Sequence, residues 1–264
     1  MANRYWNPAG AANYSSTTAW ALTDGGTADQ AAPLATDDVF FTATNANVCT
    51  ITAAAVAKTI TTTNYAGSIV GTTSKTMTLT LSGDVSVTGT LTIGGNSAVN
   101  RLLIASSVIG TPRTFTIGTL VATNIDFKDI AMVTGGADID LSAIAGGSGD
   151  CGGNDGITFT TADTWYWYAD TGSFSSQLLW FTATGGAGTR IDSDARNAKV
   201  VLPQDTCVFD DLSFSAGSKT VTQDMPRIGT TTFLGDDGAH AVTNVPTWTT
   251  STDASVFGSL TLAS

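Results

Sequence analysis

The sequence of 264 residues contains no Glu, so all 22 of its acidic residues are Asp. Charge of either sign is scarce: 12% of the residues are charged, against about 25% in average globular proteins. Asp favours turns and caps over helix interiors, because its short side chain bonds to the nearby backbone. The lack of Glu therefore predicts a chain with little helix and many turns.

Basic residues are also few. The 11 Lys and Arg residues are spread over the whole chain without a cluster, and the net charge is −11. Binding to nucleic acid requires Lys and Arg to neutralise phosphates, and attraction to an anionic membrane requires the same charge. The composition therefore excludes nucleic acid and anionic lipid as the main partners.

Long apolar runs are missing as well. No run reaches the roughly 18 residues of a membrane span. The N-terminal sequence MANRYWNPAG does not have the charged and then apolar layout of a signal peptide. We therefore expect no membrane insertion, and we expect a protein that is made in a cytoplasm and is not exported by the usual route.

Residues with reactive side chains are rare. The three cysteines, Cys49, Cys151 and Cys207, are odd in number and far apart, which argues against a disulfide framework and a zinc site and favours small buried residues. His240 is the only His, lies in the turn-like GDDGAHAV, and has no GxSxG motif to complete a serine triad. The sequence thus predicts no catalytic residue, no cofactor and no essential metal.

Thr, Val and Gly dominate what is present, with 28 Gly residues in the chain. Branched β-carbons pack well on a pleated surface, and Gly permits tight turns. Alternation with a period of two is plain in TMTLTLS (76–82) and TGTLTIGG (88–95), and Gly, Asn, Asp or Ser separates such runs. The sequence predicts an all-β protein.

One pattern occurs twice, about 160 residues apart. Residues 5–26 read YWNPAGAANYSSTTAWALTDGG, and residues 166–186 read YWYADTGSFSSQLLWFTATGG. The aromatic pairs, the second Trp and the double Gly have nearly the same spacing, and a Pro precedes a strand-like run after each copy. This match predicts an internal duplication with the same local structure at 5–42 and 166–210.

The duplication suggests three regions. Residues 1–38 form an aromatic N-terminal cap and attachment segment, residues 39–160 a first β-repeat module, and residues 161–264 a second, incomplete copy of the module. The Gly-rich stretch GGSGDCGGNDG (146–156) precedes the second copy and is interpreted as a hinge.

Two architectures fit many short strands with regular turns. We favour parallel β-solenoid (β-helix) modules with aromatic-rich turn and cap segments, because hairpin signals such as Asn-Gly are absent between most adjacent runs. The runs that begin near Ile60 and Leu79 lie about one coil apart. A β-sandwich, jelly-roll or barrel remains the alternative.

Several segments carry a resemblance to a known group. The opening YW…W…GG…P…DDVFF, the run NRLLIASSVIGTPRTFTIG…NIDFKDI and GDCGGNDGITFTT resemble bacteriophage virion proteins with β-helical repeats, of the tail-fibre and surface-appendage type. The resemblance covers residues 4 to about 215, and its motifs are architectural. It implies an extended, multimeric virion part that contacts a host surface or decorates the particle, and it implies no catalytic residue.

Two groups of acidic residues are candidate sites. Asp126 and Asp129 could hydrolyse a glycan as paired carboxylates, but their odd spacing puts them on opposite faces of a regular strand, and the nearest basic residues, Arg113 and Lys128, are isolated. Oxygen ligands on Gly-rich loops suit Ca²⁺, although without Glu or EF-hand spacing loop capping is favoured. The residues of this second group are Asp138, Asp140, Asp150, Asn154 and Asp155.

Aromatic and Thr residues offer two further surfaces. The tryptophans could be sugar-stacking platforms, but their repeated spacing favours caps that close the open end of a β-stack. Thr-x-Thr runs are typical of ice-binding ladders, but TITTT, TMTLTL and TFTI are unevenly spaced along the sequence, which argues against a ladder. The tryptophans in question are Trp6, Trp20, Trp165, Trp167 and Trp180.

The sequence thus predicts a non-enzymatic structural component of a bacteriophage virion, made in the host cytoplasm. A tail fibre or tail-associated adhesin is favoured, with a capsid decoration protein or head fibre next and a glycan-cleaving tailspike as the competing class. The expected partners are sister chains in a homo-oligomer, most simply a trimer, other virion proteins through the N-terminal region, and a host surface glycan.

Overall fold

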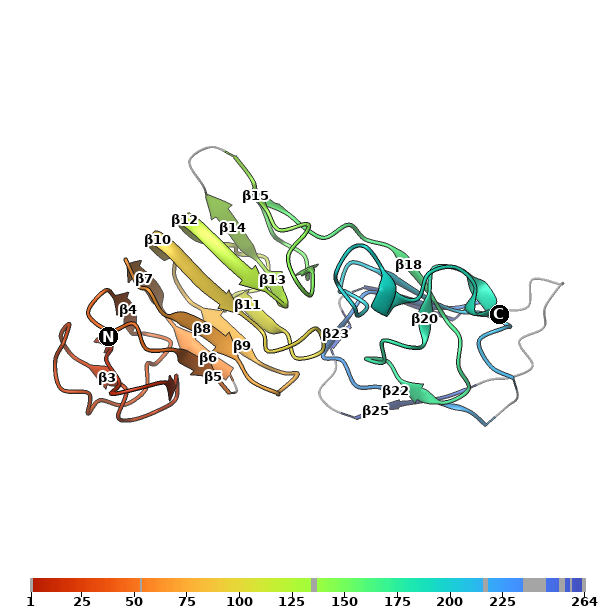
Figure 1. Ribbon diagram of the computed structural model, residues 1–264, viewed down its shortest axis with the longest axis horizontal. Helices are drawn as coiled ribbons and strands as arrows, with labels where there is room; N and C mark the ends of the chain where they lie inside the picture. Colours follow the sequence, from red (N-terminus) through yellow and green to blue (C-terminus); the bar gives the residue numbers. More distant parts are fainter. Residues whose placement is uncertain are drawn as a thin grey trace.

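The computed structural model describes residues 2–52, 54–133, 137–215, 218–234, 246–251, 255–256 and 258–262. Strands make up 45% of the described residues and helices 3%, so the all-β prediction is confirmed. Among the described residues, helix is confined to two short 3-10 turns, η1 (Thr184–Gly186) and η2 (Ile191–Ser193). The molecule is elongated, with the N-terminus near one end and the C-terminus near the other (Figure 1).

Strands of the first half are stacked in three columns, to which each circuit of the chain adds parallel strands. The first column starts at the aromatic strand β1, with the short β3 (Trp20–Ala21) paired antiparallel to it. Its parallel members are β1 (Asn3–Trp6), β4 (Asp38–Thr42), β7 (Thr59–Thr63), β10 (Val85–Gly94), β12 (Arg113–Thr123) and β14 (Ile130–Val133).

The other two columns are parallel as well. The second contains β2 (Ala12–Asn13), β5 (Cys49–Ile51), β8 (Ser68–Gly71) and the later parts of β10 and β12. The third contains β6 (Ala54–Ala57), β9 (Thr78–Leu81), β11 (Leu102–Ser106), β13 (Ile125–Lys128) and β16 (Ser148–Asp150). A short pair, β15 (Ile139–Asp140) with β17 (Ile157–Thr158), follows these columns.

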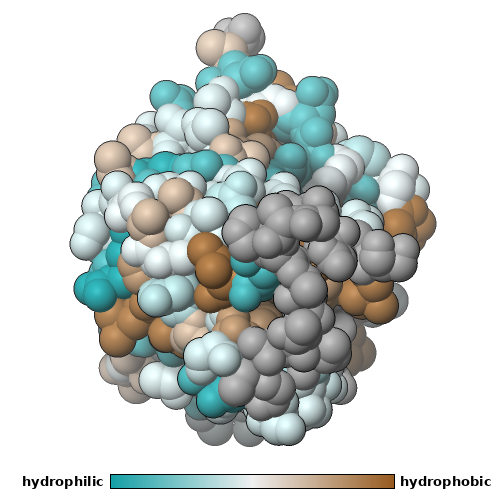
Figure 2. Space-filling view, turned by 90° about the vertical axis from the view of Figure 1, so that its right-hand side faces the viewer, coloured by the Kyte–Doolittle hydropathy of each residue, from teal (hydrophilic) through white to brown (hydrophobic). Residues whose placement is uncertain are grey.

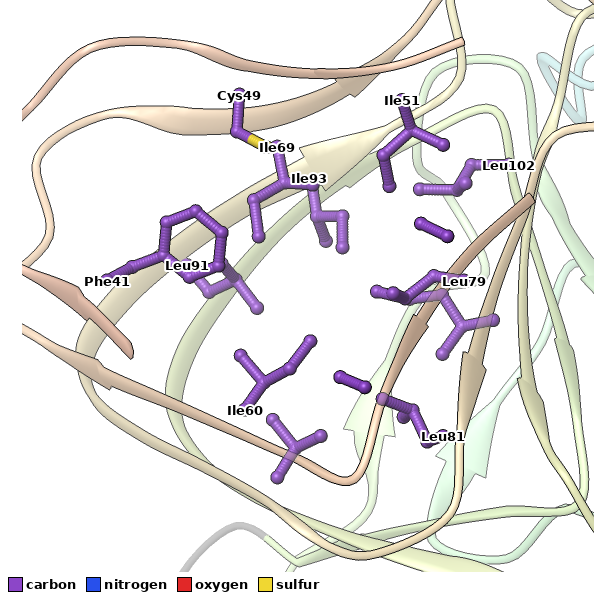
Figure 3. Close-up of a cluster of buried hydrophobic side chains, with 14 of the residues drawn as sticks. Phe41, Cys49, Ile51, Ile60, Ile69, Leu79, Leu81, Leu91, Ile93 and Leu102 are labelled. Atoms are coloured by element: carbon purple, nitrogen blue, oxygen red, sulfur yellow. The ribbon is translucent and has the colours of Figure 1, made fainter. Parts of the chain in front are cut away.

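Apolar side chains alternate inward along each strand and align from strand to strand. Burying such a side chain is worth about 1.5–3 kcal/mol, so each aligned row stabilises several circuits of the chain at once. Figure 3 shows side chains from the three columns pointing toward one interior. One such row, in which every residue is at most 5% exposed, is Val39, Ile60, Val85, Phe115 and Met132.

The second half repeats the pattern with fewer circuits. Its strand β20 (Trp180–Phe181) pairs antiparallel with β18, and its remaining ladders are parallel. The three series are β18 (Thr164–Trp167), β21 (Thr206–Phe209), β24 (Thr230–Phe233) and β27 (Leu260–Leu262); β19 (Gly172–Ser173), β22 (Thr220–Gln223) and β25 (Thr247–Thr250); and β23 (Arg227–Ile228) with β26 (Ser255–Val256).

The two aromatic segments have the same local structure. Trp6 pairs with Trp20 across β1 and β3, and Trp167 pairs with Trp180 across β18 and β20. The two rings of each pair meet edge to face, at 5.0 Å in the first copy and 5.1 Å in the second. The matched spacing in the sequence therefore corresponds to matched strand pairing and matched ring geometry.

Hydrogen bonds repeat in the same way. The indole nitrogen of Trp20 donates to the Tyr14 carbonyl at 2.8 Å, and that of Trp180 donates to the Phe174 carbonyl at 2.9 Å. A polar partner satisfies each buried indole N–H, which would otherwise cost about 1–3 kcal/mol. Each second Trp thus anchors the loop that precedes it.

A buried Asp closes the loop before the next strand in both copies. The Asp37 carboxylate accepts the backbone N–H of Leu34 at 3.2 Å, and the Asp205 carboxylate accepts that of Leu202 at 2.8 Å. Each carboxylate also accepts a backbone N–H from just before the first strand of its copy, so the same side chain joins two segments of backbone. Such acceptors stabilise N–H groups that no strand partner satisfies.

The Gly-rich stretch 146–156 is a part of the stack, so its interpretation as a hinge is wrong. It contains β16, which pairs with β13 in the third column. Farther along, the N–H of Cys151 donates to the Phe127 carbonyl at 2.9 Å, and that of Asp155 donates to the Ile130 carbonyl at 3.0 Å. The glycines on either side of β16 have positive φ angles, which permit tight turns between paired segments.

The two halves are also bonded to each other. The side-chain amide of Gln204 donates to the carbonyls of Ser148 and Thr160, and its oxygen accepts the N–H of Asp150 at 2.9 Å. Farther along the interface, Lys75 forms an ion pair of 2.5 Å with the Asp224 carboxylate. These contacts join segments that are 44 to 149 residues apart in the sequence.

Candidate functional site

Three charged side chains meet where the halves join. Asp126 occupies an outward position on β13, between the inward Ile125 and Phe127. Its carboxylate accepts the Nε–H of Arg101 at 2.7 Å and the Nε–H of Arg227 at 2.6 Å. Arg227 belongs to β23 in the second half, and the side chain of Asp126 is only 1% exposed.

Backbone carbonyls complete this cluster. Arg101 donates to the carbonyls of Gly146, Ile125 and Gly147, and Arg227 donates to the carbonyl of Arg101 at 3.1 Å. Burial by itself would raise the pKa of the Asp126 carboxyl, but the two guanidinium groups outweigh burial and hold this pKa below its usual value. The carboxylate is therefore ionised and enclosed, which suits joining the halves and not attack on a glycan.

Asp129, the other carboxylate of the pair that the sequence disfavours, lies at the turn after β13. Asp129 follows β13 with a φ of 53°, is buried, and has Lys128 at 3.9 Å. Asp126 therefore lies within the strand, and Asp129 lies at the turn that follows it. The expectation that basic residues near Asp126 are isolated is wrong, because Arg101 and Arg227 converge on it from positions distant in the sequence.

Three of the five loop residues with oxygen ligands, Asp140, Asp150 and Asn154, form hydrogen bonds within their own loops, as the favoured capping role predicts. The Asp140 carboxylate accepts the N–H of Ser142, and the Asp150 carboxylate accepts the N–H of Gly152 together with the amide of Asn154. Within the described ranges, no three His, Cys, Asp or Glu side chains gather as metal donors. The full set considered was Asp138, Asp140, Asp150, Asn154 and Asp155.

The tryptophans are buried in the core and have no face open to a sugar. Each of the five considered is at most 1% exposed. Trp165 shows how tightly they are held, since its indole N–H reaches the Asp205 carboxylate and the guanidinium of Arg196 lies 4.9 Å from its ring. The alternative in which these tryptophans form sugar-stacking platforms is therefore wrong. His240 lies outside the described residues.

The Thr runs are better aligned than their sequence spacing implies. Thr61 of TITTT pairs with Ser86, and Ser86 pairs with Thr116 of TFTI, so these three lie in one outward row of the first column. TMTLTL lies in the third column instead. The row ends in Phe40 on one side and Val133 on the other, so the hydroxyl ladder spans three strands and is not uniform.

A concave site lies in the second half, which faces the viewer in Figure 2, where apolar residues form separate patches among hydrophilic ones. The pocket has a volume of about 470 Å³, within the range of sites for small ligands. The loops after β18 and β21 and the backbone at Gly185 build it. Its main lining residues are Tyr168, Asp170, Gly185, Asp211, Leu212 and Phe214.

The charge at this pocket is ordered by hydrogen bonds. The Asp170 carboxylate accepts the N–H of Ser215 at 2.8 Å and the ammonium group of Lys219 at 3.0 Å. These donors, the backbone N–H first, lower the pKa of Asp170 to about 2. Asp170 is therefore a fixed hydrogen-bond acceptor at neutral pH and is poorly suited to donate a proton as a general acid.

No family model, curated protein or solved structure matches the chain. None of the described helices is long and apolar enough to cross a membrane.

Proposed function

We propose that this chain is a structural, non-enzymatic component of a bacteriophage virion, most simply a tail fibre or tail-associated adhesin. The observation that carries the proposal is the tandem of two copies, each stacked in parallel columns of short strands. A fibre needs length, stiffness and repetition, and stacked circuits of chain supply all three.

The columns support a parallel β-solenoid as the architecture of each copy. In such a fold every circuit places its strands on the preceding circuit, which gives in-register parallel ladders at each side. The row from Val39 to Met132 runs through five strands in this manner. A sandwich or jelly-roll would instead be built of antiparallel strands, and this argues against the alternative.

Stiffness between the copies has its own support. The buried cluster of Asp126, Arg101 and Arg227 joins β13 to β23 across the two halves. Removing one partner of a buried ion pair destabilises a protein by several kcal/mol. Separating the halves would leave these charges without their partners, so the cluster opposes separation. A stiff rod holds its far end at a fixed distance and direction from its anchored end, as an appendage requires.

The partners follow from this role. We propose that the chain forms a homo-oligomer, most simply a trimer, because fibres close by rotational symmetry. A permanent interface of this kind should bury well over about 2,000 Å² in total. The N-terminal region would attach to other virion proteins, and the far end would contact a host surface glycan.

Two alternatives differ in what they require. A capsid decoration protein or head fibre shares the architecture and differs only in its place on the particle. A glycan-cleaving tailspike requires a carboxylic acid that donates a proton. Asp126 is buried, and the hydrogen bonds to Asp170 keep it ionised, so neither carboxylate suits that step. The geometry therefore favours binding over cleavage.

The protein composition of purified phage particles, and the mass of the chain in solution, test the proposal. Virions purified on a density gradient are analysed by mass spectrometry, and the purified chain is weighed in solution by analytical ultracentrifugation. We expect the chain in the virion at a fixed copy number, and a trimer in solution. Absence from virions would refute the virion role, and a stable monomer would refute the trimer.

A further inference from the structure

The two copies share a backbone at the place where the second copy has its pocket. A Cβ placed on Gly25 would lie 3.3 Å from the Thr44 side chain, and one on Gly185 would lie 3.0 Å from the Leu212 side chain. Both glycines have a φ near 68°. These positions are therefore equivalent, and the copies can be compared residue by residue.

Side-chain amides occupy this place in the first copy. The Asn45 amide donates to the Pro8 carbonyl at 2.8 Å and to the Asn7 side-chain oxygen at 3.1 Å. In the second copy Tyr168 and Ser213 stand at the positions of Asn7 and Asn45. The Ser213 hydroxyl donates to the Trp167 carbonyl at 2.8 Å. The space beside Tyr168 is therefore left open.

Apolar walls of the pocket are exposed yet held in place. Tyr168 is 48% exposed and meets Phe181 edge to face at 6.1 Å, while the backbone of Gly186 approaches its ring closely. Leu212 is 47% exposed, and Phe214 forms a buried floor. An aromatic ring fixed in this way binds a flat apolar face without first losing conformational freedom.

The polar groups stand beside these walls. Asp170, held by Ser215 and Lys219, presents a carboxylate whose charge is balanced by the ammonium group. Asp211 is a second carboxylate in the lining. A sugar ring combines an apolar C–H face with hydroxyl donors, so an aromatic wall and adjacent carboxylate acceptors match its two sides.

We propose that the Tyr168 pocket binds a neutral sugar residue of a surface glycan. This inference deepens the proposed adhesin role and rests on it. Acidic sugars are disfavoured by Asp211 in the lining and by the net charge of −11. Cationic ligands are disfavoured because Lys219 already neutralises Asp170 at 3.0 Å. The first copy serves as scaffold, and the second as the binding copy.

Binding can be measured on the purified chain. Methyl glycosides of glucose, galactose and mannose are titrated into isotope-labelled protein and followed by proton–nitrogen correlation NMR. We expect at least one glycoside to shift amides of 168–170, 185–186 and 211–215 saturably, with a dissociation constant on the order of millimolar. Tetramethylammonium and N-acetylneuraminic acid serve as the cationic and anionic probes.

Variants identify the wall that binds. Tyr168→Ala should weaken binding about tenfold or more, because it removes the aromatic contact. Leu212→Ala should weaken binding as well, and serves as a second variant should Tyr168→Ala disturb the loop. Leu178→Ala is the matched control, because Leu178 is 56% exposed in the same half and does not line the pocket.

Four results would overturn the inference: no saturable shift with any of the glycosides, shifts outside the pocket, stronger binding of either charged probe, or unchanged affinity in both pocket variants. Its failure differs from failure of the virion role. A chain that binds sugar but is absent from virions retains the pocket and loses the phage assignment. A virion chain that binds no sugar does the reverse.

Discussion

Replacing Asp126 by Asn tests whether the buried charge cluster holds the halves together. Asn has nearly the shape of Asp but no charge, so Asp126→Asn leaves the two buried guanidinium groups of Arg101 and Arg227 without a negative partner and replaces one of their two acceptor oxygens by an NH2 donor. Removing one partner from a buried ion pair costs about 3–5 kcal/mol. This is a large share of the roughly 5–15 kcal/mol that stabilises a folded protein.

A second substitution sharpens the reasoning. Arg227→Met removes one cation and leaves Asp126 paired one to one with Arg101, so we expect a smaller loss than for Asp126→Asn. Asp192→Asn is the control, because it breaks an exposed pair with Arg190 and should change stability within experimental error. We therefore expect the unfolding free energy to fall most for Asp126→Asn, less for Arg227→Met and least for Asp192→Asn.

Urea unfolding followed by Trp fluorescence measures these losses. With a slope of about 3 kcal/mol per molar for a chain of this size, Asp126→Asn should lower the midpoint by about 1 M or more. Equal losses for Asp126→Asn and Arg227→Met would refute the idea that two cations depend on one carboxylate. A loss for Asp126→Asn as small as that of the control would refute the cluster as a joint.

Three further predictions follow from the same structure. Folding lowers the pKa of Asp126, so its carboxylate stabilises the folded state above the unfolded pKa of about 3.9, and this stabilisation is lost as the pH falls through the folded pKa. The difference in unfolding free energy between the wild type and Asp126→Asn should therefore narrow in acid. A difference that stays constant with pH would contradict this. Burial raises the pKa of all three cysteine thiols, so a thiol reagent at pH 8 should find none in the native protein and three after denaturation. Trp20→Phe and Trp180→Phe each remove one indole hydrogen bond, and each should lower the unfolding free energy by about 1–2 kcal/mol; clearly unequal losses would contradict equivalent roles.

The sequence predicted strands where alternation was regular and aromatic loops where spacing was repeated. TMTLTLS forms β9 with its Leu residues inward, and the two Trp pairs adopt one geometry. Such features depend on neighbours within a few residues, or on a repeat visible in the sequence. The aromatic spacing also favoured caps over sugar platforms, and the tryptophans are buried.

Pairing between distant segments was harder to predict. Circuits of the chain differ in length, so the uneven sequence spacing of TITTT and TFTI hid the fact that Thr61 and Thr116 share a row through Ser86. Arg227 lies 101 residues from Asp126, and no local pattern joins them. Glycines at 146–156 suggested flexibility, whereas their positive φ angles turn a paired backbone sharply.

The pocket was missed for a different reason. It is lined by residues at which the two copies differ. The sequence prediction depended only on the positions that the two copies have in common. Tyr168 replaces Asn7, and Leu212 replaces Thr44, so two polar positions become apolar in the second copy. Such a change at exposed loop positions is a signal that a comparison of the two copies can detect.

Imaging of phage particles tests whether the chain has the proposed role in a virion. A cryo-electron microscopy reconstruction of the particle, with antibody fragments against residues 2–52 and 164–210 as markers, would place each copy. We expect a projecting assembly of stacked β copies, with the first copy against the particle and the second copy farther out. Density for the chain inside the capsid, an outward first copy with a docked second copy, or no chain in the particle would contradict it.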